Sequence, residues 1–366
     1  MRVIVQREVL LKPLQQVVNV VERRQTMPVL ANLLVVARDG RLSLTGSDAE
    51  VEMIGRCQVD VLEPGETTIP ARKLFDLIRA LPDGSSIQIT LKDDKVTIQA
   101  GRSRFVLSTL PSRDYPAVET GELLERVEIP EAVLRELIDR TKFAMAQQDV
   151  RYYLNGLLID LDGNTLRCVA TDGHRLAMCE ADLPAPVVSR RHLIVPSKGI
   201  QELQRLLESG ERHVVLEVGR NHVRIQREDV TFTSKLIDGR FPDYEAVMPI
   251  GADKIVIINR EALRSALQRA SILANEKYRG VKLELNASLL RVAAHNPEQE
   301  EAEEELEAES TTEHLSVGFN VVFLLDALAV LREEKVKLML RDANSGALLT
   351  DVGSDRCSNV VMPLRL

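Results

Sequence analysis

A threefold internal repeat is the feature that most limits how these 366 residues can fold. Apolar residues recur every three or four positions over 7–24, 130–148 and 259–277, and this period predicts three amphipathic helices. A second helical segment begins at Pro70, Pro196 and Asn320. Corresponding segments start 123 to 129 residues apart, close to one third of the chain, so we expect three copies of one domain.

The segments between the predicted helices alternate apolar and polar residues around short polar turns. The stretches VARDGRLSLTG, LLIDLDGNTLRCVA and LELNASLLRVAA are each typical of a β-hairpin. Helices that lie beside antiparallel strands make an α+β domain. The predicted fold is therefore three tandem, similar α+β domains over 1–121, 122–245 and 246–366, each with antiparallel sheets and two helices.

Composition removes several classes of protein. The 47 Lys and Arg residues against 55 Asp and Glu give a net charge of −8, which excludes a generally basic nucleic-acid coat but not a basic patch. Aromatic residues make up 3% and Trp is absent, so we expect no aromatic platform for stacking bases. Four cysteines without a CxxC spacing predict reduced thiols in the cytosol, rather than a zinc site or a disulfide framework.

Charged residues gather in two kinds of segment. Cations such as Arg72, Lys73 and Lys198 occur on predicted helix faces. They are either solvated residues in ion pairs along the helix, or a surface that attracts DNA phosphates without sequence preference. The run EQEEAEEELEAE, 298–309, is either a solvated loop or one half of a contact between copies. In the second case it faces Arg102 and Arg104 of another copy, so two subunits close a head-to-tail ring.

Six stretches resemble a known family in their order along the chain. RSRFVLSTLP, QDVRYYLNG, ATDGHRLA, FTSKLIDGRFPDY, NPEQEEAEE and VVMPLRL are similar to the bacterial DNA polymerase III beta subunits, the replicative sliding clamps. The resemblance implies a ring-shaped homodimer with the DNA clamp fold, whose inner helices surround double-stranded DNA. It also implies a processivity factor with no catalytic residue, no metal and no cofactor.

The same resemblance implies the partners and the place of action. The clamp tethers the catalytic subunit of the replicative polymerase, and a clamp-loader complex opens and closes it with ATP that the loader hydrolyses. Translesion polymerases, mismatch-repair proteins and ligase-type proteins bind by short peptide motifs. We expect a bacterial cytoplasmic protein that joins the nucleoid during replication, and no membrane partner, because no signal peptide or apolar stretch of about 20 residues is present.

The family's motifs assign residues to three surfaces. The DNA-binding residues are Arg24, Arg72, Gln148, Tyr152, Tyr153 and Lys198. The partner-peptide groove comprises Arg151, Leu154, Thr171, Gly173, His174, Arg175, Leu176, Pro242, Val247, Asn320, Phe323, Val360, Val361, Met362, Pro363, Leu364 and Arg365. The dimer interface comprises Lys73, Arg102, Arg104, Ile272, Leu273, Glu300, Glu301, Glu303 and Glu304, with Ile272 and Leu273 as its apolar centre.

The residues of the groove have a physical rationale of their own. Leu, Val, Met and Pro side chains rimmed by His and Arg form a surface typical of protein binding, onto which an unfolded partner segment with apolar anchors can dock. Four positions differ from the family pattern that we expect, and they bear on which peptide is preferred: Ala246, Tyr278, Phe323 and Asn344.

Two other functions compete with this interpretation. Asp172 and His174 in TDGHRL are an acid–base pair by residue type, which would serve a nuclease-type enzyme, but the chain carries no GxSxG, Walker or HExxH motif. A monomeric, non-ring interaction scaffold is the second alternative. No helix-turn-helix or zinc-finger spacing supports sequence-specific DNA reading.

Overall fold

The computed structural model describes residues 1–22, 27–116, 118, 121–249, 251–286, 288–311 and 314–365. The chain forms two compact units, of which the first contains Met1–Ala132 and Lys198–Leu236. The second contains Val133–Ser197 and Ile237–Leu366. Each unit therefore combines a terminal third of the chain with part of the central third.

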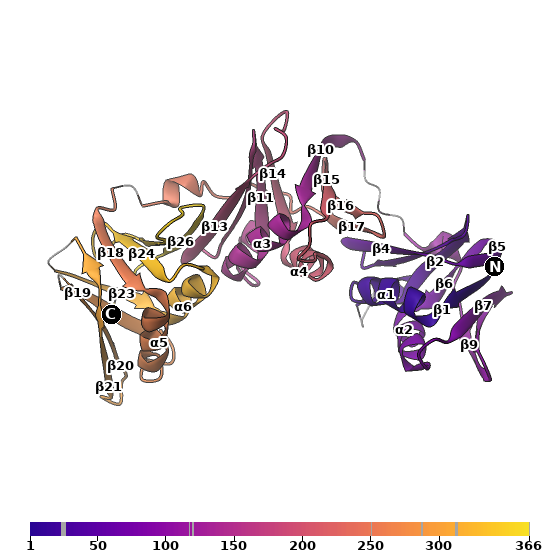
Figure 1. Ribbon diagram of the computed structural model, residues 1–366, viewed down its shortest axis with the longest axis horizontal. Coiled ribbons are helices and arrows are strands. Elements are labelled where there is room, and N and C mark those ends of the chain that lie inside the picture. The colour runs from indigo at the N-terminus through magenta and orange to yellow at the C-terminus, as the bar shows by residue number, and fades with distance from the viewer. Residues whose placement is uncertain are drawn as a thin grey trace. The chain divides into compact units, whose positions relative to one another are not determined.

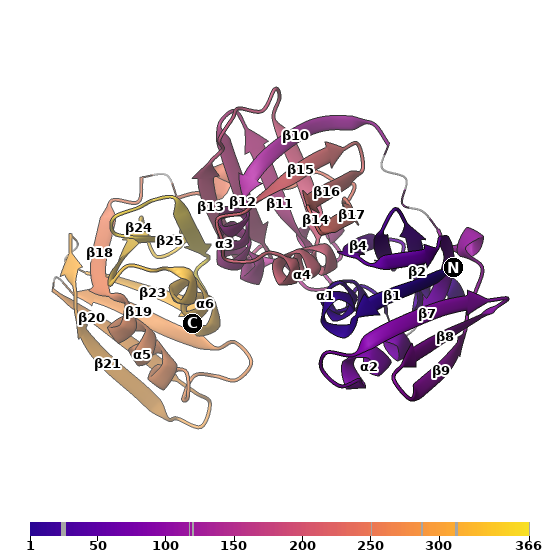
Figure 2. The same cartoon turned by 45° about the vertical axis from the view of Figure 1, so that its right-hand side comes forward.

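The first unit contains a small antiparallel sheet made only from the first third of the chain. Its strands lie in the order β5 (Asp60–Glu63), β1 (Arg2–Gln6), β7 (Ser86–Lys92), β8 (Lys95–Ala100) and β9 (Ser103–Ser108). Figure 2 shows β7, β8 and β9 side by side. One edge of this sheet is β9, which carries Arg104.

A larger, eight-stranded sheet joins the first third to the central third. Its order is β10 (Leu123–Pro130), β15 (His213–Gly219), β16 (His222–Arg227), β17 (Val230–Lys235), β4 (Val51–Gln58), β3 (Arg41–Ser47), β2 (Asn32–Arg38) and β6 (Gly65–Pro70). The two thirds meet where β4 pairs with β17, from Val51↔Ser234 to Gly55↔Val230. We call this ladder the first seam.

Two helices, α1 (Arg7–Val18) and α2 (Ala71–Ala80), pack together in the first unit (Figure 1). Leu10, Leu14 and Val17 on α1 are fully buried because the apolar period places them on one face. α1 also contacts β4 closely: a Cβ on Gly55 would lie 2.9 Å from the Pro13 Cβ, so only glycine permits this approach. Two short 3-10 helices, η1 (Pro28–Ala31) and η2 (Ser112–Asp114), complete this part of the chain.

The second unit repeats this plan with a nine-stranded sheet. The order is β14 (Arg191–Pro196), β11 (Gly156–Asp162), β12 (Thr165–Thr171), β13 (Arg175–Asp182), β26 (Cys357–Val361), β25 (Ala347–Asp351), β24 (Lys335–Leu340), β18 (Lys254–Asn259) and β22 (Glu309–Ser310). Here β13 of the central third pairs with β26 of the last third, from Arg175↔Val361 to Cys179↔Cys357. We call this ladder the second seam.

A four-stranded sheet belongs entirely to the last third. Its order is β21 (Glu301–Glu307), β20 (Leu289–His295), β19 (Gly280–Asn286) and β23 (Leu315–Asn320). The helices α5 (Arg260–Ala270) and α6 (Val321–Val330) contact each other, and α5 also contacts β20 and β21. The Asn320 side chain caps α6 by accepting a hydrogen bond from the Val322 amide at 2.9 Å.

The remaining helices come from the central third. α3 (Glu131–Thr141) and α4 (Ser197–Leu206) each have residues in both units. Three 3-10 helices of the second unit are η3 (Lys142–Ala144), η4 (Tyr152–Leu154) and η5 (Glu245–Val247).

The predicted α+β fold with three similar domains is confirmed, and the three hairpins form as β2–β3, β11–β12 and β19–β20. The helices end earlier than predicted. In the first third the apolar pattern continues to Val21, but α1 ends at Val18 and the buried Val20 and Val21 lie in the turn that follows. The acidic run is not a loop, because β21 occupies most of it.

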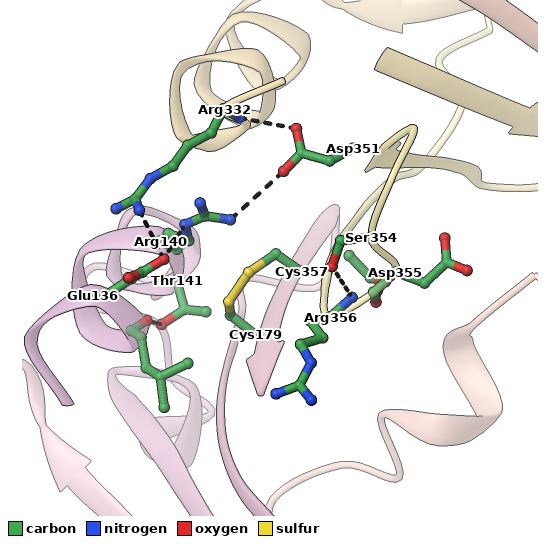
Figure 3. The surroundings of a disulfide bond; sticks show 12 residues. Glu136, Arg140, Thr141, Cys179, Arg332, Asp351, Ser354, Asp355, Arg356 and Cys357 are labelled. Carbon is green, nitrogen blue, oxygen red and sulfur yellow. Dashed lines mark hydrogen bonds and ion pairs between the residues drawn. A yellow bond between two sulfur atoms is a disulfide. The ribbon is translucent and has the colours of Figure 1, made fainter. Parts of the chain in front are cut away.

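The expectation of reduced thiols is wrong for one pair of cysteines. Cys179 and Cys357 form a disulfide across the second seam (Figure 3). Cys57 and Cys168 are free. The two bonded residues face each other directly in the β13–β26 register, with their Cα atoms 4.1 Å apart. They are 178 residues apart in sequence, so no local spacing could indicate the pair.

Candidate functional site

The tight turn between β12 and β13 is built by Asp172. Its Oδ1 accepts hydrogen bonds from the amides of His174 at 2.9 Å and Arg175 at 3.0 Å, while Gly173 adopts a left-handed φ of +88°. The Asp172 carboxylate, which by residue type could be the acid of an acid–base pair, therefore stabilises an Asx turn. No observation here favours the nuclease-type alternative.

Arg151 lies over this turn in a fixed position. Its guanidinium bonds both carboxylate oxygens of Asp149, at 3.1 and 2.8 Å, and donates to the Asp172 carbonyl at 3.3 Å. A Cβ on Gly173 would lie 3.1 Å from the guanidinium nitrogens, so the glycine makes room for them. The hydrogen bonds from the Arg151 side chain and backbone lower the pKa of Asp149 to about 2, which keeps the pair ionised.

Arg175 is committed to contacts inside the second unit. It donates to Asp172 at 3.1 Å, to Asp326 on α6 at 2.5 Å and to the Phe143 carbonyl at 2.8 Å. Its guanidinium carbon also lies 4.6 Å from the centre of the Phe323 ring, and only 13% of its side chain is exposed. Arg175 therefore supports Phe323 rather than offering a free cation.

The C-terminal segment runs beside the same turn. The Met362 amide donates to the His174 carbonyl at 2.9 Å, and the Leu364 amide donates to the Gly318 carbonyl at 2.8 Å. His174 and Phe323 stack with their ring centres 6.5 Å apart. The last third and the central third thus contribute neighbouring side chains to one surface.

The predicted groove residues divide into a buried floor and an accessible rim. Those that are almost fully buried are Leu154, Leu176, Val360 and Val361. Those that are exposed are Arg151, Gly173, His174, Pro242, Val247, Met362 and Arg365. Thr171 is buried at 8% exposure, and Asn320, Phe323, Pro363 and Leu364 are half-buried. Among these, Met362 and Val247 have exposed fractions of 40% and 43%, so apolar surface is available to a partner.

Sequence reasoning missed the acidic residues that position this surface. Asp149 and Asp326 hold the two arginines, and Asp172 shapes the turn between them. The Asp-x-Arg spacing of Asp149 and Arg151 is a usable local signal. Asp326 meets Arg175 across 151 residues, so the sequence alone carries no sign of that contact.

The predicted DNA-binding residues differ in how available they are. Arg24 lies outside the described residues. Gln148 is exposed with a left-handed φ of +55°, and Tyr152 is 57% exposed. Tyr153 packs partly buried against the cluster that includes Leu176 and Val360, as an ordinary packing residue does.

The two cations of this set that are described both have partners in the first unit. Arg72 is exposed and donates to the Val21 carbonyl at 3.3 Å. Lys198 forms ion pairs with Glu22, at 2.5 Å, and with Asp48. Although burial opposes the charge, hydrogen bonds to both carboxylates raise the pKa of Lys198. The positive charge of the Lys198 ammonium is therefore already paired with two carboxylates of the same chain.

The predicted dimer residues lie on α2, at or next to the edge strands β9 and β21, and just after α5. Lys73, Arg102 and Arg104 are exposed, and Ile272 is 77% exposed with Leu273 half-buried. The acidic residues are partly engaged within the chain: Glu304 binds Arg269 in a bidentate pair at 2.7 Å, and Glu303 pairs with Arg291. Glu300 closes a turn with Asn296, and Glu301 is exposed.

Two features bear on ligands and membranes. Within the described residues, no group of three or more His, Cys, Asp or Glu side chains is placed to hold a metal ion. None of the described helices is both long and apolar enough to span a bilayer.

Comparison with known proteins identifies close relatives along the whole chain. Models of the N-terminal, central and C-terminal domains of the DNA polymerase III beta subunit match residues 1–119, 128–243 and 245–365. The Beta sliding clamp of Pseudomonas putida is 54% identical over 99% of both chains, and that of Escherichia coli K12 is 46% identical over all of both. A sliding clamp from Pseudomonas aeruginosa, solved with griselimycin bound, is 54% identical and superposes with a TM-score of 0.97 over the full length of both chains.

Proposed function

The chain belongs to the DNA polymerase III beta subunit family, the bacterial sliding clamps, and we propose from this membership that two copies close a ring around duplex DNA. The clamp is a processivity factor: it holds the replicative polymerase on its template and catalyses no reaction itself. A clamp loader opens and closes the ring with ATP. Its site of action is the bacterial cytoplasm, at the nucleoid during replication.

The observation that carries the proposed ring is the opposite charge of two sheet edges. β9 presents Arg104 beside Arg102, whereas β21 alternates exposed glutamates with inward-facing Ala302 and Leu306. An edge strand has unpaired backbone groups that can bind another strand. Because the basic edge belongs to the first third and the acidic edge to the last third, pairing between copies runs head to tail and closes on two subunits.

The oligomeric state tests this ring. Replacing Ile272 and Leu273 together by Glu removes the apolar centre of the contact and should convert a dimer into a monomer, as measured by native mass spectrometry. Val188→Glu is the matched control, because Val188 is an exposed apolar residue (92%) outside both edges. A dimer that survives the double substitution contradicts the assignment.

The partner-peptide groove is proposed at the surface formed by Arg151, His174, Val247, Phe323 and Met362. Accessible apolar side chains give a partner segment its anchors, and the fixed Arg151 offers a cation at the rim. Partners of this kind are the polymerase catalytic subunit, the clamp loader, translesion polymerases, mismatch-repair proteins and ligase-type proteins. We also place griselimycin, which is bound to the Pseudomonas aeruginosa relative, in this groove.

Removal of 362–366 tests the groove. The tail contributes Met362 and the Leu364 backbone contact, so the shortened chain should lose griselimycin and polymerase binding. It should still form the dimer, because the tail belongs to neither edge strand. Full retention of griselimycin affinity by the shortened chain shows that the groove lies elsewhere.

Contact with DNA is proposed for Arg24, Arg72, Gln148, Tyr152, Tyr153 and Lys198. Each cation adds one screened phosphate contact without reading sequence, so no single substitution should abolish association with DNA. The boundaries 1–121, 122–245 and 246–366 remain the proposed limits of the three domains.

A further inference from the structure

A buried carboxylate lies beneath one wall of the proposed groove. Asp160 on β11 has no exposed surface, and its Oδ2 accepts a hydrogen bond from the Tyr244 hydroxyl at 2.6 Å. Arg190 donates to both carboxylate oxygens, at 3.1 and 2.7 Å, and His192 Nε2 lies 3.2 Å from Oδ1. We call these four residues the Asp160 cluster.

The Asp160 cluster is held together by charge. Burial alone would favour the neutral acid, but hydrogen bonds from Arg190 and Tyr244 lower the pKa of Asp160, so the carboxylate is ionised at neutral pH. Burial and the neighbouring carboxylate raise the pKa of Tyr244 to about 12, so its hydroxyl stays protonated and donates. A hydrogen bond to a buried ion is among the stronger single contacts in a protein.

Tyr244 joins this cluster to the groove in two ways. Along the chain it lies between Pro242 and Val247, and its carbonyl accepts from the Val247 amide at 3.2 Å, which starts the η5 turn. In space its ring packs in the buried cluster that contains Leu176 and Val360, two residues of the groove floor. The hydroxyl thus links the segment 242–247 to the buried Asp160 carboxylate.

We propose that Asp160 and Tyr244 are positioning residues that hold Pro242 and Val247 in the conformation that receives a partner peptide. The inference rests on the proposed groove and adds two buried residues to it. Among the described residues, the backbone hydrogen bonds of this exposed turn are short-range: Val247 donates to Tyr244, and Met248 donates to Glu245. The Asp160 cluster adds long-range contacts, through the Tyr244 hydroxyl and through Arg190, which bonds Glu245 at 3.3 Å. A ligand that must order the wall itself binds more weakly, because part of its binding free energy goes into the ordering.

Removal of one hydroxyl tests this role. Tyr244→Phe keeps the ring in its apolar cluster and deletes the hydroxyl, which donates to Asp160 at 2.6 Å and accepts from Arg190 at 3.3 Å. We expect its affinity for griselimycin, measured by isothermal titration calorimetry, to fall about three- to tenfold relative to wild type. Amide hydrogen exchange of 242–248 in the free protein should become faster in the same variant.

Tyr115→Phe is the matched control. Tyr115 is 8% exposed and its hydroxyl donates to the Thr45 carbonyl at 3.1 Å, so this variant also loses a buried tyrosine hydrogen bond. It belongs to the first unit, which contributes no groove residue. Its griselimycin affinity should stay within twofold of wild type. An unchanged affinity in Tyr244→Phe, or an equal loss in Tyr115→Phe, overturns the positioning role.

A third variant separates this inference from the proposed groove itself. Val247→Glu places a charge on the wall and should reduce griselimycin binding at least a hundredfold if the groove is assigned correctly. If Val247→Glu weakens binding and Tyr244→Phe does not, the groove stands and the positioning role fails. If neither variant changes binding, the groove assignment fails and the positioning role fails with it.

Discussion

The two seams share one pattern of strand pairing but differ in the side-chain contacts that stabilise it. In each, a strand of the central third pairs over five residues with a strand of a terminal third: β17 with β4, and β13 with β26. Ion pairs flank the first seam, with Lys198 bound to Asp48 and Glu22, and Lys12 3.3 Å from Asp229.

The second seam contains a covalent bond in addition to its ion pairs. The Cys179–Cys357 disulfide closes one end of the ladder, and Arg140 reaches Asp351 at 3.7 Å nearby (Figure 3). The other end of the same ladder provides Leu176 and Val360, which belong to the floor of the proposed groove. We therefore expect the two seams to differ in their response to solution conditions, because a thiol reductant can break a bond only at the second seam.

The largest expected effect comes from removing the covalent bond. Cys357→Ser should lower the stability of the second unit by about 3 kcal/mol, because a cross-link over a long loop restricts the unfolded chain. Urea unfolding without reductant measures this loss, and wild type with reductant should match the variant. Cys57→Ser is the control, since Cys57 is free. If reductant does not change the wild-type curve, the disulfide does not stabilise this seam.

A smaller loss is expected when the first seam loses its charge pair. Asp48 is 6% exposed as a side chain, and Asp48→Asn leaves the Lys198 ammonium with Glu22 alone, so we expect a loss of about 2 kcal/mol. Lys198→Met should cost a similar amount, and the double variant little more than either, in a double-mutant cycle of urea unfolding. Fully additive losses would mean that Asp48 and Lys198 do not interact.

The same pair predicts a pH dependence with a definite sign. The pKa of Lys198 is raised in the folded protein, so the stability it contributes is complete below the unfolded-state pKa of about 10.4 and is lost as pH rises through the folded-state pKa. The difference between wild type and Asp48→Asn should therefore be constant from pH 7 to 10 and shrink above pH 10.5. A difference that grows in alkali has the wrong sign for this mechanism.

The smallest effect belongs to an ion pair beside the disulfide. Arg356 lies 2.6 Å from Asp182, but both side chains are more than half exposed, so water and salt compete with the contact. Arg356→Gln should leave the thermal midpoint unchanged within error. A clear shift would show that surface charge matters at the second seam as well.

Much of this architecture is predictable from the sequence because it depends on local periods. The helix starts near Arg7, Pro130 and Asn259 follow from apolar spacing, and the Asp39–Gly40 turn forms with both residues at positive φ. The groove residues remain a prediction from family motifs; two of them, Met362 and Val247, are exposed apolar side chains.

What the sequence could not provide are partners that only the folded chain brings together. Asp160 meets Tyr244 across 84 residues, and Lys198 meets Asp48 across 150. The residue type of Lys198 and its place on a predicted helix face suggest a phosphate contact. No local sequence pattern indicates its carboxylate partners, Glu22 and Asp48, which are distant in sequence. The same holds for the cysteines of the second seam, whose thiols meet only through strand register.

The alternation of charge along β21 has a consequence for which copies can meet. Four glutamates, Glu301, Glu303, Glu305 and Glu307, point to one exposed face of that edge. Two such edges brought together would place like charges opposite one another, and repulsion makes that encounter unfavourable. The glutamates therefore disfavour pairing between two β21 edges and leave a basic edge as the favourable neighbour.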